Sequence, residues 1–326
     1  MKLLGLTCGT EMGNTEVLVR EALMAAEAAG VEVALVRLLD LDLKPCTGCK
    51  SCVESLMKGG AGNCIIKDDF PFLDDLIMES DGVILGAPVF VLGAHGLVKL
   101  LADRMGPSHD LAWRLEARKI REESGRTQGK GPDGRSFKRR IGGFVSVGGA
   151  STQNWLSLGL PTMHLLSFPS HITVVDQMQV RGTTAIGNVV LTPEALERAQ
   201  GLGRNVAEAM LKPDEEPRWR GAEGICPVCH CDLLSITGGR LVECAVCGIA
   251  GTLTTDGGRI TVTFNEEEQR RSRLALGGKK EHWDEVRAAL GTFFQRPDLP
   301  QIPQRLEKYA RHPIPLLTAD GEVART

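Results

Sequence analysis

Eight of the ten cysteines in this chain fall into two groups whose spacing suits metal or redox chemistry. The later group pairs two CxxC sequences, Cys226 with Cys229 and Cys244 with Cys247, across fourteen intervening residues. Two such knuckles on tight turns bring four thiolates into a closed tetrahedron, and a closed four-cysteine site usually has a structural role. Zinc is the predicted metal, and an electron-relaying iron of the rubredoxin type is the alternative.

The earlier group places Cys46, Cys49 and Cys52 at three-residue intervals, followed by Cys64 after eleven residues. Runs of this kind ligate [4Fe-4S] clusters. The alternatives are a cluster-free loop or redox disulfide, and zinc. The distinction matters because a cluster could divide a two-electron reaction at a neighbouring cofactor into single-electron steps.

A third candidate site is an anion-binding turn formed by Gly9, Gly13, Asn14 and Thr15, between an apolar strand and a helical pattern. Backbone N–H groups at such a turn and at the helix N-terminus favour a phosphate. The turn is neither GxGxxG nor GxxxxGK[ST], which disfavours a dinucleotide fingerprint and a nucleoside triphosphatase.

The elements that position these groups alternate between strands and helices. Strands are expected at 2–7, 31–39, 82–90, 141–149 and 172–177, with helices between them and a long helix at 193–212. This alternation predicts an α/β fold with a doubly wound parallel sheet and right-handed crossovers. The loops CGTEMGNT, APVFVLGAHG and VGGASTQN leave the carboxyl ends of three strands and should form one cofactor crevice.

Four motifs in this order resemble the flavodoxin-like NAD(P)H-dependent FMN reductase family, especially its iron-sulfur flavoprotein branch. They are TCGTEMGNTEVL, KPCTGCKSC with CIIKDDF, DGVILGAPVFVLGAHGLVKLLADRMG, and SVGGAS, and the match spans about residues 1 to 210. The resemblance implies a flavodoxin-like fold, FMN as the cofactor and NAD(P)H as the co-substrate. We also expect a homo-oligomer.

The resemblance also implies which residues bind FMN. The phosphate-loop positions are Thr7, Gly9, Thr10, Gly13, Asn14 and Thr15. Pro88, Val89 and Phe90 match the segment that lines the isoalloxazine ring, and Gly148, Gly149 and Ala150 match the third flavin loop. The phosphate loop lacks the arginine common in the family, so backbone dipoles and hydroxyls would hold the phosphate. Phe90 replaces a common tyrosine and keeps its stacking surface.

His95 is the candidate catalytic residue, on the loop before the helix that follows the flavin-lining segment. A histidine near a flavin could protonate a substrate reduced by hydride, because its pKa lies near working pH. A structural histidine is the alternative. We interpret Lys99, Asp103 and Arg104 as structural ion-pair residues, and the 68–69 aspartates as helix caps.

Composition shifts divide the chain. The flavodoxin-like FMN-binding domain is expected at 1–212, and within it 110–140 is a basic insertion with ten Lys or Arg residues. We interpret the insertion as a solvated flexible loop, with a lid or an anion clamp as alternatives. A linker at 213–224 leads to a zinc-ribbon-like domain at 225–264. A helical tail at 265–326 should pack on the core or on a partner subunit.

The overall charge and hydropathy narrow the function. The net charge is −3, which gives no case for nucleic acid, and no apolar run or export signal points to a membrane. We expect a cytoplasmic FMN-dependent oxidoreductase that passes electrons from NAD(P)H or a carrier protein to a small organic acceptor. The alternatives are a non-enzymatic flavin/iron-sulfur electron carrier and a flavin-sensing zinc-ribbon binding module.

Overall fold

The central sheet of the computed structural model is parallel, with strand order β2-β1-β3-β5-β6. The structure describes residues 1–312, 316–317 and 323–324. The strands are β1 (Lys2–Thr7), β2 (Glu32–Arg37), β3 (Gly82–Phe90), β5 (Arg140–Val147) and β6 (Ile172–Val180), and the short β4 (Gly93–Ala94) pairs with β3. This is the flavodoxin-like order, so the predicted fold class is confirmed.

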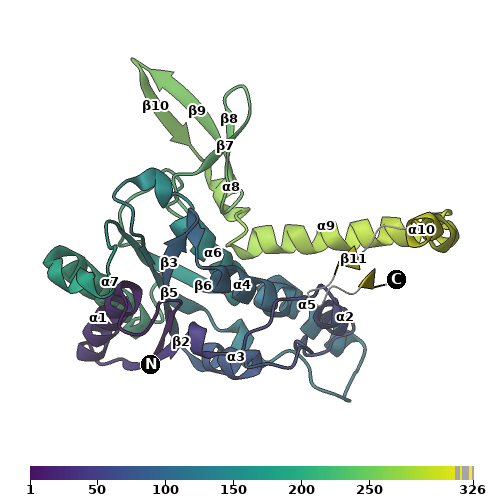
Figure 1. Cartoon of the computed structure of the whole chain (residues 1–326). Coiled ribbons are helices and arrows are strands. Elements are labelled where there is room, and N and C mark those ends of the chain that lie inside the picture. The colour runs from purple at the N-terminus through teal and green to yellow at the C-terminus, as the bar shows by residue number, and fades with distance from the viewer. Residues whose placement is uncertain (313–315, 318–322, 325–326) are drawn as a thin grey trace. The chain divides into compact units, whose positions relative to one another are not determined.

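Helices cover both faces of the sheet (Figure 1). On one face lie α1 (Asn14–Ala28) and α7 (Pro193–Leu211), and on the other lie α3 (Phe70–Glu79), α4 (Gly96–His109) and α6 (Gly159–Ser170). Each layer buries its apolar side chains against the sheet in a separate core cluster. The strands are therefore apolar on both faces, as is usual for parallel sheets.

Close packing fixes α1 against the sheet and against α7. A Cβ on Gly86 of β3 would lie 2.3 Å from Val19 Cγ2, and a Cβ on Gly203 of α7 would lie 1.9 Å from the Ala22 carbonyl oxygen. Only glycine fits at these two positions. The N-terminus of α1 is thereby held beside the carboxyl ends of β1 and β3, where the strand order reverses.

The basic insertion contains regular structure. Residues Leu111–Glu123 form α5, whose first turn is buried, and Gly134–Phe137 form a 3-10 turn. The predicted flexible loop is therefore wrong for α5. Arg121 and Arg126 donate to the carbonyls of Gly59 and Lys58, beside the short helix α2 (Ser51–Met57) of the cysteine loop. The insertion and the cysteine loop are thus neighbours.

A second sheet is antiparallel, with order β10-β9-β8-β7. Its strands are β7 (Leu234–Gly238), β8 (Leu241–Cys244), β9 (Ala250–Asp256) and β10 (Arg259–Thr263). The Arg220 N–H in the preceding segment donates to the Val175 carbonyl of β6, at 2.7 Å. After α8 (Glu266–Arg270), the buried Lys279 ammonium donates to the Phe168 carbonyl.

Contacts divide the chain into two compact units, 1–280 and 281–326. Helix α9 (Leu276–Phe294) begins in the first unit, and the second contains α10 (Ile302–Arg311) and the strand pair β11 (Leu316–Leu317) and β12 (Val323–Ala324). Among the described residues, no helix combines the length and apolar character that crossing a bilayer requires. The expected packing of the tail on the core or a partner remains a prediction.

Candidate functional site

A cavity of about 370 Å³ lies at the carboxyl ends of β1, β3 and β5. It brings together most of the predicted cofactor-binding residues: Gly9, Thr10, Gly13, Asn14, Thr15, Pro88, Val89, Phe90, His95 and Gly149. Thr7, Gly148 and Ala150 do not line it. The Thr7 hydroxyl accepts the Gly9 N–H at 3.0 Å, and the Gly148 N–H donates to the Val180 carbonyl at 2.9 Å. These two hydrogen bonds therefore fix the backbone next to residues that line the cavity.

The turn between β1 and α1 leaves no room for side chains at its glycines. A Cβ on Gly9 would lie 2.9 Å from Thr15 Cβ, and one on Gly13 would lie 3.0 Å from the Thr10 carbonyl oxygen. The first N–H groups of α1 have no acceptor within the helix, and the helix dipole adds positive potential there. This end of the cavity can therefore hold an anionic group through the backbone.

Asn14 has a different role from the predicted one. Its side-chain amide donates to the Ala185 carbonyl at 2.8 Å, and its side-chain oxygen accepts the Val189 N–H at 2.9 Å. Its side chain therefore ties the β1–α1 turn to the segment after β6. Any contact of Asn14 with an anion would come from its backbone N–H.

Sequence reasoning missed the wall that this segment supplies. Thr183, Thr184, Ala185 and Ile186 line the cavity next to the β1–α1 turn, to which Asn14 joins them, and Leu39 and Val147 complete the lining. A signal was present, because only three residues separate the predicted strand 172–177 from the stretch RGTTAIG, and β6 includes those three. Since all parallel strands end at the same edge of a sheet, the loop after β6 belongs with the other three.

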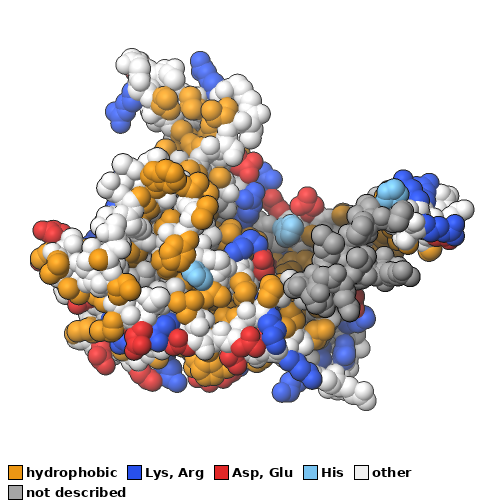
Figure 2. All heavy atoms as spheres, in the orientation of Figure 1, with side chains coloured by type: hydrophobic (Ala, Val, Ile, Leu, Met, Phe, Trp, Pro, Cys, Tyr) orange, Lys and Arg blue, Asp and Glu red, His pale blue; other side chains and the backbone are white. Residues whose placement is uncertain are grey.

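A hairpin of β3 and β4 forms the outer rim of the cavity. Val89 pairs with Ala94 and Phe90 with Gly93, so the turn consists of Val91 (φ 50°) and Leu92 (φ 72°). Positive φ is strained for a β-branched residue, and such strain concentrates at functional sites. Phe90 is 61% exposed and Val91 97% exposed. Figure 2 shows hydrophobic side chains gathered on this face, over β3 and α6.

His95 is the N-cap residue of α4, and its ring lines the cavity. Its Nδ1 accepts the Leu97 N–H at 3.1 Å, which fixes the proton of the neutral ring on Nε2. Partial burial lowers the pKa of His95 below its ordinary value. The ring therefore presents a neutral Nε2–H donor, with Phe90 edge-on at 5.6 Å between ring centroids.

Cys8 also lines the cavity, but its thiol is not a reactive group. Burial raises the pKa of Cys8 to about 12, so the thiol stays protonated. It packs with Leu6, Leu38 and Ala87 in the core cluster beneath the cavity. Its role is to fill space.

A buried ion pair attaches both ends of the earlier cysteine loop to α4. The Arg104 guanidinium pairs with Asp68, with both side chains fully buried, and it also donates to the Lys44 carbonyl at 2.7 Å. Burial opposes ionisation of Asp68, but hydrogen bonds from Arg104 and from backbone N–H groups outweigh it and hold its pKa at about 2. The predicted structural role of Arg104 and the predicted capping by Asp68 agree with these contacts, since Asp68 accepts the Phe70 N–H at 3.1 Å.

The four cysteines of this loop are free, with Cys46 and Cys49 exposed and Cys52 and Cys64 half-buried. Burial raises the pKa of Cys52, and so do the charges of Cys64 and Cys46. The Arg104 guanidinium lies beside Cys64 and places positive charge at the loop.

The later cysteines form a compact cluster. Cys226, Cys229, Cys244 and Cys247 are buried, and their sulfurs all lie within 4.8 Å of one another. The Cys226–Cys247 and Cys229–Cys244 sulfur pairs are 3.4 and 3.5 Å apart. Four ligands at about 2.3 Å around one tetrahedral ion would have edges of roughly 3.8 Å, so the cluster has the size of a single-ion site.

Comparisons with known proteins agree with this geometry. Residues 1–180 match the family described as NADPH-dependent FMN reductase. The flavone synthase cfoJ of Aspergillus candidus is 35% identical over 300 residues, which cover 89% of this chain and 90% of that protein. The iron-sulfur flavoprotein MJ1083 of Methanocaldococcus jannaschii is 30% identical over 218 residues, 64% of this chain and 97% of that protein.

Among solved structures, a flavone reductase matches with a TM-score of 0.79 and 27% identity, over 97% of this chain and 100% of that chain. The family match covers more than half of this chain, including all the strands of the parallel sheet and three of the four loops that line the cavity. This chain therefore belongs to the NADPH-dependent FMN reductase family and is an FMN-dependent oxidoreductase.

Proposed function

We propose that this chain reduces a carbon–carbon double bond conjugated to a carbonyl in a planar aromatic acceptor of the flavone type, with NADPH as the electron donor. The proposal rests on how much of this chain two relatives match: both are named for flavone, which supports the class of substrate, and the flavone reductase supports the direction of the reaction. The flavone reductase and the flavone synthase match 97% and 89% of this chain, well beyond the flavodoxin-like part, whereas the iron-sulfur flavoprotein matches 64%.

FMN fits the residues of the cavity. Gly9 lets the β1–α1 turn pack closely against Thr15 at the start of α1, and backbone N–H groups there suit a phosphate. Pro88, Val89, Phe90, Gly149 and Thr184 line the cavity and give it surfaces against which a flat ring can pack. When bound, FMN supplies hydride transfer, which the side chains of the protein cannot perform themselves.

The rim of the cavity suits an aromatic acceptor. Phe90 and Ile186 line the cavity and are 61% and 79% exposed, so they offer apolar contact area on the open side. A flat aromatic molecule covering them would gain both hydrophobic burial and ring contact. The apolar rim thus favours a conjugated aromatic acceptor over a small charged one.

His95 would orient and activate the acceptor. Its Nδ1 is occupied by the Leu97 N–H, so the Nε2–H is free to donate a hydrogen bond to the acceptor's carbonyl oxygen. Negative charge accumulates on that oxygen during reduction, and a positioned donor stabilises it. The lowered pKa keeps the ring neutral at pH 7, so His95 acts as a hydrogen-bond donor rather than as a cation.

We further propose that the later cysteine cluster binds one zinc ion. Its sulfur separations of 3.4 and 3.5 Å suit four thiolates on a single ion and are too short for a cubane. A closed site of four cysteines has no open coordination position, so its contribution is structural. It would stabilise the antiparallel sheet, whose own core cluster is small.

A second function involves the earlier cysteine loop. The three-residue spacing of Cys46, Cys49 and Cys52, and the similarity to an iron-sulfur flavoprotein, favour a [4Fe-4S] site there. The chain would then also pass single electrons to or from a carrier protein. Iron and acid-labile sulfide in protein purified without oxygen test this: about four irons per chain support a cubane, and iron-free protein with full activity excludes the role.

Product analysis tests the main proposal. FMN-loaded protein with NADPH and flavone should form flavanone, with one NADPH consumed per product. Phe90→Ala should raise the KM for flavone, whereas Phe72→Ala, which alters an exposed phenylalanine of α3 outside the cavity, should not. NADPH oxidation without any flavanone would contradict the proposed acceptor.

A further inference from the structure

A second cavity, of about 570 Å³, lies beside α3 and is separate from the sheet-end site just described. Four parts of the chain build it: the segment 61–64 of the cysteine loop, α3, the first turn of α5, and the segment 130–135 of the insertion. The lining residues that carry the argument are Cys64, Phe70, Met78, Arg114 and Lys130. None of them lines the predicted flavin cavity.

Arg114 is the unusual group in this cavity. It is 2% exposed, and its Nε donates to the Ser108 carbonyl, but its Nη1 is buried without a hydrogen-bond partner among the described residues. A buried cation without full pairing is costly. Arg114 also lies near the N-terminus of α5, where the helix dipole disfavours positive charge. Both costs would be relieved by an anion in the cavity.

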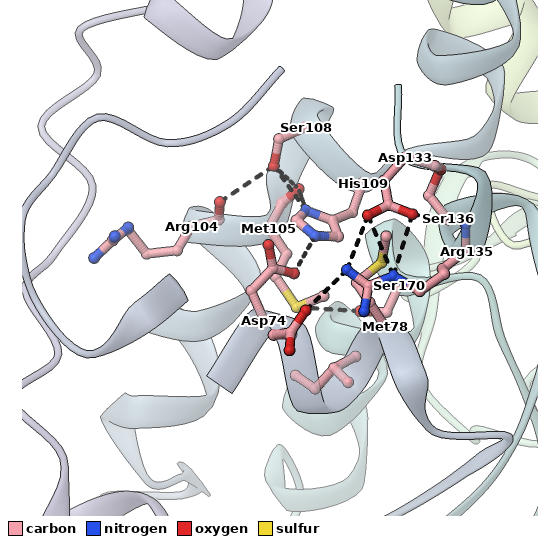
Figure 3. Close-up of polar contacts among 12 residues, drawn as sticks. Asp74, Met78, Arg104, Met105, Ser108, His109, Asp133, Arg135, Ser136 and Ser170 are labelled. Carbon is pink, nitrogen blue, oxygen red and sulfur yellow. Dashed lines mark hydrogen bonds and ion pairs between the residues drawn. The ribbon is translucent and has the colours of Figure 1, made fainter. Parts of the chain in front are cut away.

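The carboxylates of Asp74 and Asp133 act on Arg114 through their charge, but the acidic residues of the cavity form their hydrogen bonds with other groups. Arg135 pairs with Asp75 at 2.8 Å and with Asp133 at 2.9 Å. Asp74 pairs with the His109 Nε2 at 2.6 Å, as Figure 3 shows. None of these carboxylates forms a hydrogen bond with the Arg114 guanidinium, so its Nη1 is the donor in this cavity that is open to a ligand.

Ser108, His109 and Asp74 together have the residue types of a hydrolytic Ser–His–Asp triad, and the Ser108 Oγ lies 2.8 Å from the His109 Nδ1 (Figure 3). The Ser108 hydroxyl is buried and lies 2.8 Å from the Met105 carbonyl, its acceptor within the helix, and neither Ser108 nor His109 lines the cavity. The histidine instead holds Asp74 on the cavity wall. Its function is positional.

The size and walls of the cavity indicate an organic anion. Its volume is in the range of small-molecule sites. Phe70 and Met78 give a buried apolar wall, and the exposed Lys130 forms no ion pair in the part of the chain that the structure describes, so it can supply a second positive charge. A divalent cation is disfavoured because Arg114 would repel it and the carboxylates already have partners.

We propose that this cavity is a second ligand site for a small organic anion. Its carboxylate pairs with Arg114 and Lys130, and its apolar part packs on Phe70 and Met78. The ligand lies against Cys64, so an occupied site closes one side of the cysteine loop. The insertion at 110–140 thus acts as an anion clamp over α3, away from the flavin cavity.

Calorimetric titration of the full-length, FMN-loaded protein with benzoate tests the site, with benzamide as the neutral isostere and inorganic phosphate as a small anion. Benzoate should bind saturably without changing the flavin absorption spectrum, and benzamide should not bind. Arg114→Met should weaken benzoate binding about tenfold or more, as loss of a charge-assisted hydrogen bond predicts. Arg118→Met, one turn further along α5 and outside the cavity, should leave it unchanged.

Lys130→Ala provides a variant that should not disturb folding, since Lys130 is exposed. It should weaken benzoate binding about threefold. Phosphate binding tighter than benzoate would overturn the organic part of the proposal. The site itself is overturned if benzoate gives no saturable heat, if it perturbs the flavin spectrum, or if the Arg114 and Lys130 variants bind as the parent does.

Discussion

Two substitutions of His95 separate its proposed role in the reaction from its role as the N-cap of α4. The ring accepts the Leu97 N–H through Nδ1 and is proposed to donate to the acceptor through Nε2. Asn at position 95 can still accept the Leu97 N–H with its side-chain oxygen and cap α4, but it lacks the imidazole Nε2–H. Ala removes both contacts. His95→Asn should therefore retain stability and lose acceptor activation, whereas His95→Ala should lose both.

The magnitudes follow from the contacts. Replacing a good N-cap by Ala costs about 1 kcal/mol of folding free energy, and Asn caps as well as the best residues do. Loss of one positioned donor to a developing negative charge lowers the rate of the step it assists by about 10²- to 10³-fold. Reduction of FMN by NADPH does not use the acceptor's carbonyl, so that half-reaction should be unchanged in both variants.

Urea unfolding of the apoprotein measures the first quantity, and anaerobic stopped-flow absorbance of each half-reaction measures the second. The reasoning predicts that His95→Asn slows only flavin reoxidation by flavone. It is refuted if His95→Asn reoxidises at the parental rate. Equal slowing of both half-reactions would instead mean that the substitution disturbs the flavin cavity.

Three further substitutions test the buried ion pair at the cysteine loop, the β1–α1 turn and the later cysteine cluster. Asp68→Asn leaves the buried Arg104 uncompensated and should cost about 3–5 kcal/mol in unfolding experiments, against about 1 kcal/mol or less for the neighbouring Asp69→Asn. The folded pKa of Asp68 is about 2, below its ordinary 3.8. The ionised Asp68 therefore stabilises the folded protein above pH 3.8, and this contribution is lost as the pH falls toward 2. Acid unfolding of the Asn variant should lack this pH-dependent loss of stability. Gly9→Ala should weaken FMN binding about tenfold in fluorescence titrations, since its Cβ would lie 2.9 Å from Thr15 Cβ, whereas Gly96→Ala meets nothing within 4 Å and should bind normally. Cys226→Ser should abolish the bound zinc measured by mass spectrometry while FMN content persists, and Cys231→Ser should keep both; zinc retained in Cys226→Ser would contradict the assigned ligand set.

Local sequence patterns were sufficient for the elements of the parallel sheet and for much of its cavity. Apolar runs bounded by glycines identified β1, β3 and β5, and the rule that ligands bind at strand carboxyl ends led to Gly9, Phe90 and Gly149. These features depend on neighbours in sequence and on the parallel topology. No pairing between distant side chains was needed to predict them.

The features that were missed depend on contacts between distant segments. Asn14 resembles a phosphate ligand in sequence, but its amide bonds the segment around Ala185, which lies 171 residues away. Helix α5 carries so many basic residues that its buried first turn was not apparent, because arginine is rarely buried. The buried Arg114 and the cavity beside it follow from that packing and could not be predicted from periodicity.

The most direct test of the central claim is an anaerobic double-mixing experiment on the FMN-loaded chain. NADPH should bleach the flavin absorbance, and flavone added next should restore it with formation of one flavanone per flavin reduced. Flavin that remains oxidised with NADPH, or reduced flavin that flavone fails to reoxidise, would contradict the proposed reaction.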